Sequence, residues 1–148
     1  MDFQFASFSD LQDKTVLITG GGSGIGAAFV EAFVMQGSQV AFFDIQNEVS
    51  QGLVESLLEQ GPEPLFLNCD VTDIKALKQA ILTVEEELGT IGVLINNAAN
   101  DERHDPEDVS PEYWEQRLKL NLNHHFFAAQ AVQPKMAEAG GGSIINMG

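Results

Sequence analysis

The sequence predicts an α/β domain built on a doubly wound parallel sheet. Apolar stretches rich in β-branched and aromatic residues alternate along the chain with stretches of helical periodicity. The apolar stretches have no polar face, which is typical of parallel strands that helices cover from both sides. Right-handed crossovers between such strands then produce the doubly wound arrangement.

Strands and helices are expected in strict alternation. The predicted strands are 15–19, 39–44, 64–68, 93–96 and 143–147, and the predicted helices between them are 25–36, 48–60, 74–88 and 111–139. Gly37 and Gly61 suit helix C-termini, whereas Asp73 and Ser110 suit N-caps, with Pro111 at the first helical position. A further proline, at position 134, is expected to kink or interrupt the last helix.

Length, composition and charge limit the class of protein and the partners that can be expected. The chain has 148 residues, of which 44% are hydrophobic and 20% charged, as in a soluble globular domain. Residues 1–10 are predicted to form an N-terminal arm and residues 11–148 the domain itself. The net charge of the whole chain is −15, which would repel nucleic acid and an anionic membrane surface, so neither is expected as a partner.

Localisation signals are not found in the sequence. No apolar run approaches the roughly 18 residues of a membrane span, and the first residues do not form a signal peptide. The one cysteine, Cys69, has no internal disulfide partner and is expected to be a small core residue. The cytoplasm is therefore the expected compartment.

A glycine-rich stretch, TGGGSGIG at positions 19–26, joins the first strand to the first helix. Glycines let a backbone turn sharply and let a phosphate approach without a Cβ in the way. The N–H groups at a helix N-terminus point outward and carry partial positive charge, so the stretch favours a pyrophosphate site. An ordinary βα turn is the alternative for a lone glycine pattern.

An acidic residue, Asp44, ends the second strand. It follows the glycine stretch at close to the roughly 20-residue spacing of a ribose-binding acid in a dinucleotide site. A carboxylate there accepts hydrogen bonds from both ribose hydroxyls and repels a 2′-phosphate, which favours NAD over NADP. The alternative is a helix-capping aspartate in a surface loop.

Two further polar motifs follow the third and fourth strands. Asp70 is placed to reach the adenine side of a nucleotide and Val71 to pack on its ring, although Asp70 is equally typical of a turn. In the motif NNAA at 96–99, small alanines allow close approach of a ligand, and the amides can join strands or bind ribose. For Asn96 we favour the purely structural role.

Together these motifs resemble the short-chain dehydrogenase/reductase family, from about Leu11 to the end of the chain. The resemblance implies a Rossmann fold with strand order 3-2-1-4-5 for the part present, a nicotinamide cofactor, and hydride transfer at a carbinol or carbonyl carbon. Ala99 departs from the family's usual glycine. The predicted cofactor-binding residues are Gly20, Ser23, Gly24, Ile25, Gly26, Asp44, Ile45, Asp70, Val71, Asn97, Ala98 and Ala99.

The family's catalytic residues are an Asn, a Ser and a Tyr-x-x-x-Lys motif. Asn121 matches the helix Asn, which the resemblance assigns to a proton relay through water; a satisfied polar residue is the alternative. The Ser would come directly after Gly148 and the Tyr and Lys farther on, while the one tyrosine, Tyr113, does not begin that motif. We therefore expect the chain to be an N-terminal part, truncated at the C-terminus and inactive alone. The resemblance also implies a homo-oligomer at full length.

The loop after the fourth strand bears on the substrate. Asp101, Arg103 and His104 are predicted to line or brace the site of a polyhydroxylated substrate. The alternative is a solvated loop in which Arg103 pairs with local acids. The sequence around the loop is similar to the family's bacterial sugar 1-dehydrogenases, such as those acting on D-xylose, which implies NAD-dependent oxidation of an aldose to its lactone.

Two other functions and a metal site are alternatives to this interpretation. A redox sensor that binds NAD without catalysis would lack the Tyr and Lys in the full gene. A 3-oxoacyl carrier-protein reductase is disfavoured by Asp44, because those reductases mostly prefer NADPH. His124 and His125 are adjacent on a helix and face different directions, so no metal site is expected.

Overall fold

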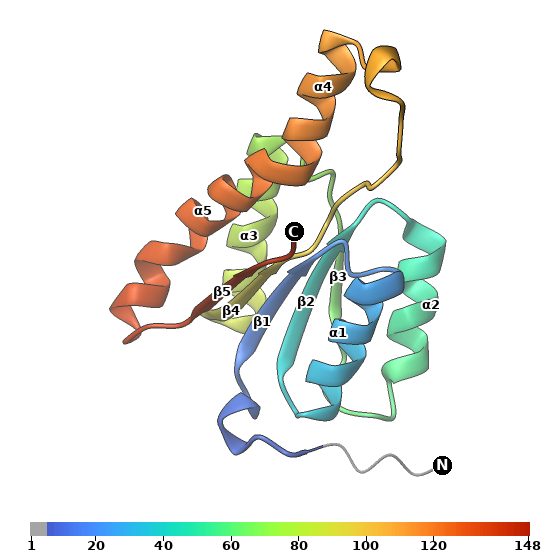
Figure 1. The fold of residues 1–148 in the computed structure, drawn as a ribbon. Helices are drawn as coiled ribbons and strands as arrows, with labels where there is room; N and C mark the ends of the chain where they lie inside the picture. The colour runs from blue at the N-terminus through green and yellow to red at the C-terminus, as the bar shows by residue number, and fades with distance from the viewer. Residues whose placement is uncertain (1–5) are drawn as a thin grey trace.

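The fold centres on a parallel sheet with strand order β3-β2-β1-β4-β5, as predicted (Figure 1). A computed structural model describes residues 6–148, so half of the predicted arm 1–10 lies outside the described residues. All four strand pairings are parallel. The strands are β1 Thr15–Thr19, β2 Gln39–Asp44, β3 Leu65–Asn68, β4 Ile91–Asn96 and β5 Ser143–Asn146.

Helices cover both faces of the sheet because the inner strands are apolar on both faces. On one face Val16 and Ile18 of β1 pack in a buried cluster with α1 and α2. On the other face Leu17 packs in a second cluster with α3 and α5. The helices are α1 Gly24–Met35, α2 Asn47–Leu57, α3 Ile74–Leu88, α4 Pro111–Leu118 and α5 His124–Glu138.

Three of the predicted helix ends are confirmed by their caps. Asp73 accepts hydrogen bonds from the first-turn N–H groups of α3, and Ser110 accepts one from the N–H of Tyr113. Gly37, at φ +79°, ends α1, and the next residue, Ser38, donates its N–H to the carbonyl of Phe33. This backward bond across the helix end is the Schellman arrangement.

The expectation that Gly61 ends a helix is wrong. α2 ends at Leu57 and has Leu58 as its C-cap. A Cβ at Gly61 would overlap the carbonyl oxygen of Val34 near the end of α1, so the glycine allows this loop to approach α1 closely. The residue type serves packing between elements here rather than a helix cap.

The predicted helix 111–139 is present as one uninterrupted helical stretch to Glu138, with an unpredicted π-helical turn inside it. The chain forms α4, then a π-helical turn η3 at Lys119–Asn123, and then α5. Pro134 lies inside α5 without ending it. The π-helical turn falls where Asn121 binds the backbone of Asn100 and where the His124 ring bonds the carbonyl oxygen of Leu120, and such turns often mark functional positions.

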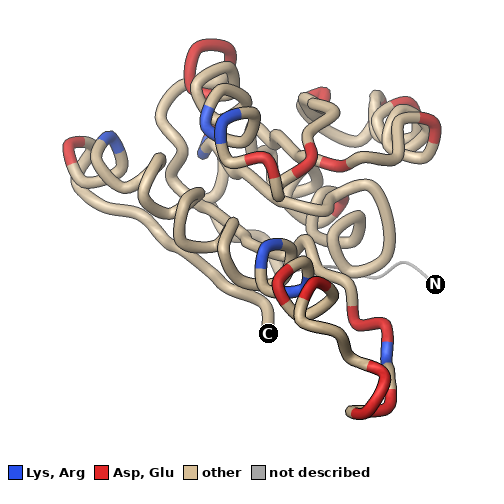
Figure 2. Tube along the Cα trace, turned by 90° about the horizontal axis from the view of Figure 1, so that it is seen from above, with Lys and Arg blue, Asp and Glu red and all other residues tan. Residues whose placement is uncertain are grey.

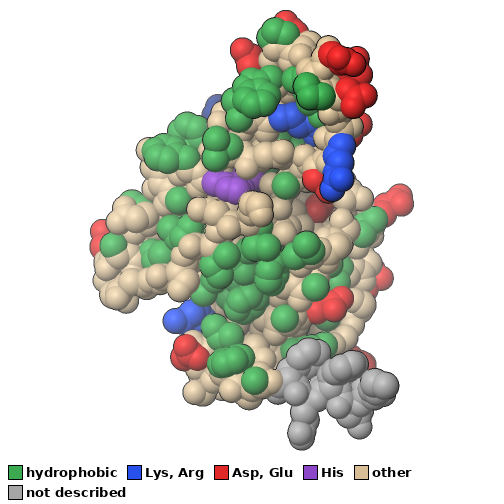
Figure 3. Space-filling view, in the orientation of Figure 1, with side chains coloured by type: hydrophobic (Ala, Val, Ile, Leu, Met, Phe, Trp, Pro, Cys, Tyr) green, Lys and Arg blue, Asp and Glu red, His purple; other side chains and the backbone are tan. Residues whose placement is uncertain are grey.

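The surface carries little positive charge and some exposed apolar side chains. Figure 2 shows acidic residues spread over the helix ends and the projecting loop before α4, with few basic residues among them. Hydrophobic side chains gather on the face shown in Figure 3. In the edge strand β5, Ile144 and Ile145 are 37% and 42% exposed. Within residues 6–148, none of the helices combines the length and apolarity that crossing a bilayer requires.

Candidate functional site

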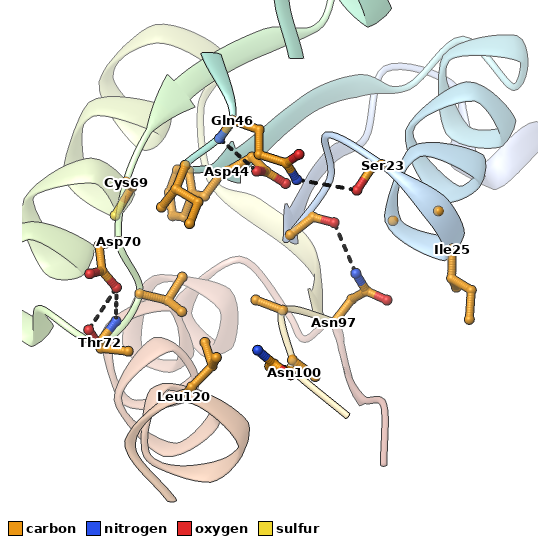
Figure 4. Close-up of a pocket in the computed structure, with 18 of the residues that line it drawn as sticks. Ser23, Ile25, Asp44, Gln46, Cys69, Asp70, Thr72, Asn97, Asn100 and Leu120 are labelled. Carbon is orange, nitrogen blue, oxygen red and sulfur yellow. Dashed lines mark hydrogen bonds between the residues drawn. The ribbon is translucent and has the colours of Figure 1, made fainter. Parts of the chain in front are cut away.

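A cavity of about 690 Å³ opens at the carboxyl ends of the parallel strands (Figure 4). It lies where the strand order reverses between β1 and β4, which is the place at which doubly wound sheets bind ligands. Its volume is within the range of small-molecule sites. The structure brings all the predicted cofactor-binding residues to its lining, together with Asp101.

Several glycines of the turn leave no room for a Cβ, and two of them, Gly20 and Gly26, fix the turn where it meets the residues after β4. Gly20 has φ +66°, and a Cβ there would lie 2.8 Å from the Cα of Ala98. A Cβ at Gly26 would overlap the carbonyl oxygen of Gly20. The turn is therefore packed against the end of β4 with no room for a side chain, which holds its backbone in one conformation.

Gly24 differs from these positions because the space beside it is open. Its φ is +56°, and a Cβ there would meet no atom within 4 Å, although the residue lines the cavity. Helix α1 starts here, and its N-cap residue Ser23 makes no side-chain capping bond. The first N–H groups of α1 are thus left at the cavity, an arrangement suited to an anion.

Asp44 is only 7% exposed, yet it lines the cavity. One carboxylate oxygen accepts the N–H of Gly22 at 2.9 Å and the other accepts the N–H of Gln46 at 2.9 Å. The Gln46 side chain in turn donates to the hydroxyl of Ser23 at 3.5 Å across the mouth (Figure 4). The carboxylate is oriented by these bonds, and each oxygen has further acceptor capacity.

The wall beyond β3 is formed by Asp70 and its neighbours. Asp70 accepts hydrogen bonds from both the N–H and the hydroxyl of Thr72, at 2.9 and 2.7 Å, so it also shapes the local turn. Val71 is buried with its edge on the cavity. Cys69 is buried as expected, and burial, with Asp70 and Asp73 nearby, raises the pKa of its thiol to about 11.

The asparagine side chains at the end of β4 join neighbouring segments by hydrogen bonds. Asn97 donates its side-chain N–H groups to the carbonyl oxygens of Thr19 and Gly20, at 3.1 and 3.0 Å, and so ties β4 to the glycine turn. Asn96 donates to the side chain of Asn146 at 2.8 Å, which joins β4 to β5. The structural role favoured for Asn96 agrees with this geometry.

Asn121 does not line the cavity but fixes a residue that does. Its Oδ1 accepts the N–H of Asn100 at 2.9 Å, and its Nδ2 donates to the carbonyl oxygen of Asn100 at 3.0 Å. The preceding residue, Leu120, contributes to the cavity lining with Asn100. The polar side chain in the π-helical turn thus holds the loop after β4 against the helix.

The three predicted substrate residues separate in the structure. Asp101 lines the cavity, whereas Arg103 and His104 are not among its lining residues. The His104 ring packs edge-on against Tyr113, with ring centres 4.4 Å apart. Among residues 6–148, the ion pairs of this loop join Glu102 to Arg117 and to His104 and do not include Arg103.

Several lining residues were not predicted from the sequence. Each lies next to a predicted residue in the chain, and Leu120 precedes Asn121, so adjacency to a motif was the signal available. None of their side chains is charged. These residues are Phe43, Gln46, Cys69, Thr72, Asn100 and Leu120.

A family model described as short chain dehydrogenase matches residues 14–148. The chain belongs to this family. Among its relatives, a probable galactose dehydrogenase of Rhizobium meliloti, GalD, is 48% identical over 99% of the chain. A D-xylose 1-dehydrogenase of Caulobacter vibrioides is 43% identical over 97% of the chain. The match covers 57% and 56% of these two relatives, so the chain spans little more than half their length.

A solved structure supports the same fold. The aldohexose dehydrogenase of Thermoplasma acidophilum, in its ligand-free form, superposes with a TM-score of 0.81 at 32% identity. The match covers 95% of this chain and 51% of that one. The predicted Rossmann-type architecture and the family resemblance are therefore confirmed.

Members of the family bind nicotinamide cofactors, and the cavity has the features that such a group needs. Open space beside Gly24 and the N-terminus of α1 suit a pyrophosphate, and a buried acid stands at the end of β2. Two large apolar side chains at the cavity, Ile25 and Ile45, are 64% and 67% exposed. A ligand packed on either side chain would remove part of that apolar surface from water.

Proposed function

We propose that the chain binds NAD in this cavity and forms the cofactor-binding part of an enzyme that oxidises an aldose to its lactone. The observation that carries the cofactor choice is Asp44, buried and oriented at the end of β2. No Lys or Arg is among the described residues that line the cavity. A 2′-phosphate would meet this carboxylate without a cation to offset the repulsion.

Each part of NAD has a matching group in the proposal. The pyrophosphate lies over Gly24 at the N-terminus of α1, and the adenosine ribose bonds to Asp44. Adenine packs between Ile45 and Val71 beside Asp70. The nicotinamide end lies toward Ala98 and the residues that follow it, Ala99 included. When bound, the cofactor supplies a carbon that accepts hydride from the substrate.

The substrate proposal rests on the relatives and on one polar wall. The names of two relatives and of the similar solved structure refer to galactose, D-xylose and aldohexose. In this chain Asn100 and Asp101 bring an amide and a carboxylate to the end of the cavity beside Leu120. Such groups can hydrogen-bond the hydroxyls of a sugar, which an apolar substrate does not need.

In this mechanism Asn121 has two tasks. It keeps Asn100 in place through its two hydrogen bonds, and the family resemblance adds the holding of a water in a proton relay. The base that takes the substrate proton is not within the described residues in this proposal, because Tyr113 packs on His104 and Arg117 away from the cavity. Residues 1–148 alone are then expected to bind NAD without oxidising a sugar.

Calorimetric titration of the 148-residue chain with NAD and with NADP tests the cofactor assignment. We expect NAD to bind at least about tenfold more tightly, as an unpaired phosphate near a buried carboxylate implies. Tighter binding of NADP, or no binding of either, would overturn the proposal.

The substrate assignment needs the complete gene product. Sequencing beyond the codon for Gly148 shows whether Ser and Tyr-x-x-x-Lys follow, and a product that has them is assayed with NAD and a panel of aldoses. Oxidation of D-galactose or D-xylose is the expected result. In the same product, His104→Ala reports on the loop: unchanged kcat and KM for every sugar would remove His104 from the substrate site.

A further inference from the structure

His124 is a fully buried histidine that lies behind the cavity and outside its lining. Its ring connects two parts of the fold. Nδ1 lies 2.6 Å from the carbonyl oxygen of Leu120 in the π-helical turn, and Nε2 lies 3.3 Å from the hydroxyl of Thr19 at the end of β1. The sequence separation between His124 and Thr19 shows that this contact exists only in the folded chain.

The chemistry of the partners determines which ring nitrogen carries the proton. A carbonyl oxygen can only accept, so Nδ1 is the protonated nitrogen that donates to Leu120. Nε2 then has a free lone pair and accepts the hydroxyl proton of Thr19. A neutral imidazole is the one form that makes both bonds together.

The Thr19 hydroxyl is fully used in this arrangement. Its oxygen accepts the backbone N–H groups of Asn97 and Ala98, both at 3.0 Å, while its proton goes to His124. The three bonds meet the full donor and acceptor capacity of a hydroxyl. Such a saturated network in a buried site holds its members in one geometry.

Both ends of the chain of bonds reach the cavity. At one end, Thr19 orients Asn97 and Ala98, which line the cavity beside the glycine turn. At the other end, His124 bonds the carbonyl oxygen of Leu120, whose residue lines the cavity near Asn100. We call these two parts of the lining the Ala98 wall and the Leu120 wall. The hydrogen bonds that connect them run through the His124 ring.

We propose that His124 is a positioning residue that sets the distance between the Ala98 wall and the Leu120 wall of the cofactor cavity. The residue touches neither ligand nor solvent and acts through Thr19 and Leu120. For the identity of the ligand this inference rests on the proposed function, whereas the hydrogen-bond network stands on the geometry alone.

The electrostatic surroundings agree with the neutral ring that the network needs. Burial, followed by the neighbouring ring of His125, lowers the pKa of His124 to about 4. The two rings are edge-on, with centres 4.4 Å apart. At neutral pH the imidazole is uncharged, so one nitrogen donates while the other accepts.

Three variants of the 148-residue chain test the proposal by NAD titration beside thermal unfolding. His124→Leu keeps a side chain of similar size and removes both bonds, and we expect NAD affinity to fall about tenfold or more. His124→Gln can restore a hydrogen bond, so its affinity should lie between those of His124→Leu and the unchanged chain. The matched control, His125→Gln on the adjacent position, should bind NAD as the unchanged chain does.

Two outcomes of these titrations would overturn the proposal. One is a folded His124→Leu that binds NAD as tightly as the unchanged chain. The other is His124→Gln binding no better than His124→Leu although both melt at the same temperature. If the unchanged chain does not bind NAD at all, the proposed function fails instead.

A measurement on the unchanged chain covers the case in which His124→Leu does not fold. Nitrogen-15 NMR of the imidazole distinguishes the two neutral tautomers and the protonated ring. We expect the Nδ1–H tautomer for His124 at pH 7, with and without NAD. An Nε2–H tautomer or a protonated ring at that pH would overturn the network.

Discussion

The glycine turn 19–26 and the loop 100–108 lie at the same edge of the sheet, yet they are built in opposite ways. In the turn the backbone itself is fixed, because the sites beside Gly20 and Gly26 leave no room for a Cβ. In the loop the backbone is held mainly at Asn100, and the side chains that follow bind one another at the surface. The conformation of the turn therefore depends on the lack of room for side chains, whereas the contacts of the loop depend on exposed side chains.

This difference decides how much each region should respond to substitution. A substitution in the turn must displace packed backbone and therefore alters the cavity lining. A change in the loop is buffered by solvent and by neighbouring charges. Substitutions in the turn should therefore have larger effects on cofactor binding than substitutions around the loop.

The largest effect is expected for Gly26→Ala. The new methyl group would overlap the carbonyl oxygen of Gly20, so the turn must shift and NAD affinity should fall on the order of 100-fold. Gly52→Ala is the matched control, since a Cβ at Gly52 in α2 meets nothing within 4 Å. Titration calorimetry measures the NAD affinity of both variants. Equal NAD affinity of Gly26→Ala and the unchanged chain would contradict the contrast between the turn and the loop.

Acid should destabilise the fold through the buried ring of His124. Its pKa falls from 6.5 to about 4 on folding, so between these values the unfolded chain binds a proton that the folded chain does not. The stabilising contribution is fully present above pH 6.5 and is lost toward pH 4, at most about 3 kcal/mol. Urea unfolding at pH 7 and 4.5 measures it, and His124→Gln should show a flatter dependence. An equal slope in both proteins would contradict the assignment.

Asp44→Asn should relax the choice between NAD and NADP by about 10- to 100-fold, chiefly by weakening NAD. The amide loses the charge and one of the two acceptors that hold Gly22 and Gln46. Glu48→Gln removes an equal charge from an exposed position in the first turn of α2 and serves as control. Competitive titration of the two cofactors gives the ratio. A ratio changed equally by both variants would show a general charge effect.

The smallest effect is expected for Arg117→Gln in α4, which removes the ion-pair partner of Glu102 in the loop. Arg117 pairs with Glu102, whose side chain is 58% exposed, and packs its guanidinium on the ring of Tyr113. Loss of these contacts should lower the free energy of unfolding by about 1 kcal/mol or less and leave NAD affinity within about twofold. Chemical denaturation and cofactor titration report the two quantities. A tenfold loss of NAD affinity would show that the loop is coupled to the cavity.

Prediction from the sequence succeeded where a pattern is local in the chain. Strand order followed from the family motifs, and the caps at Asp73, Ser110 and Gly37 were visible as residue types at helix ends. The residues predicted to bind the cofactor lie along one cavity because all of them follow the carboxyl ends of parallel strands. Their binding roles remain predictions that the titrations above address.

What the sequence did not predict depends on contact between distant parts of the chain. Gly61 does not end a helix but packs against Val34 near the end of α1, and Asn121, in the unpredicted π-helical turn, binds Asn100 in the loop after β4. His104 packs on Tyr113 outside the cavity lining, and its role toward a substrate stays a prediction. None of these contacts follows from a short, repeating spacing along the sequence.

By itself the sequence determined the doubly wound sheet, the glycine turn at the switch point and an acid at the end of β2. Periodicity and residue type suffice for these features because backbone conformation and strand direction are local properties. Only the tertiary structure decided that Asn121 holds Asn100 and that His124 links Thr19 to Leu120. Hydrogen bonds between buried groups depend on where packing places them, and packing is a property of the whole fold.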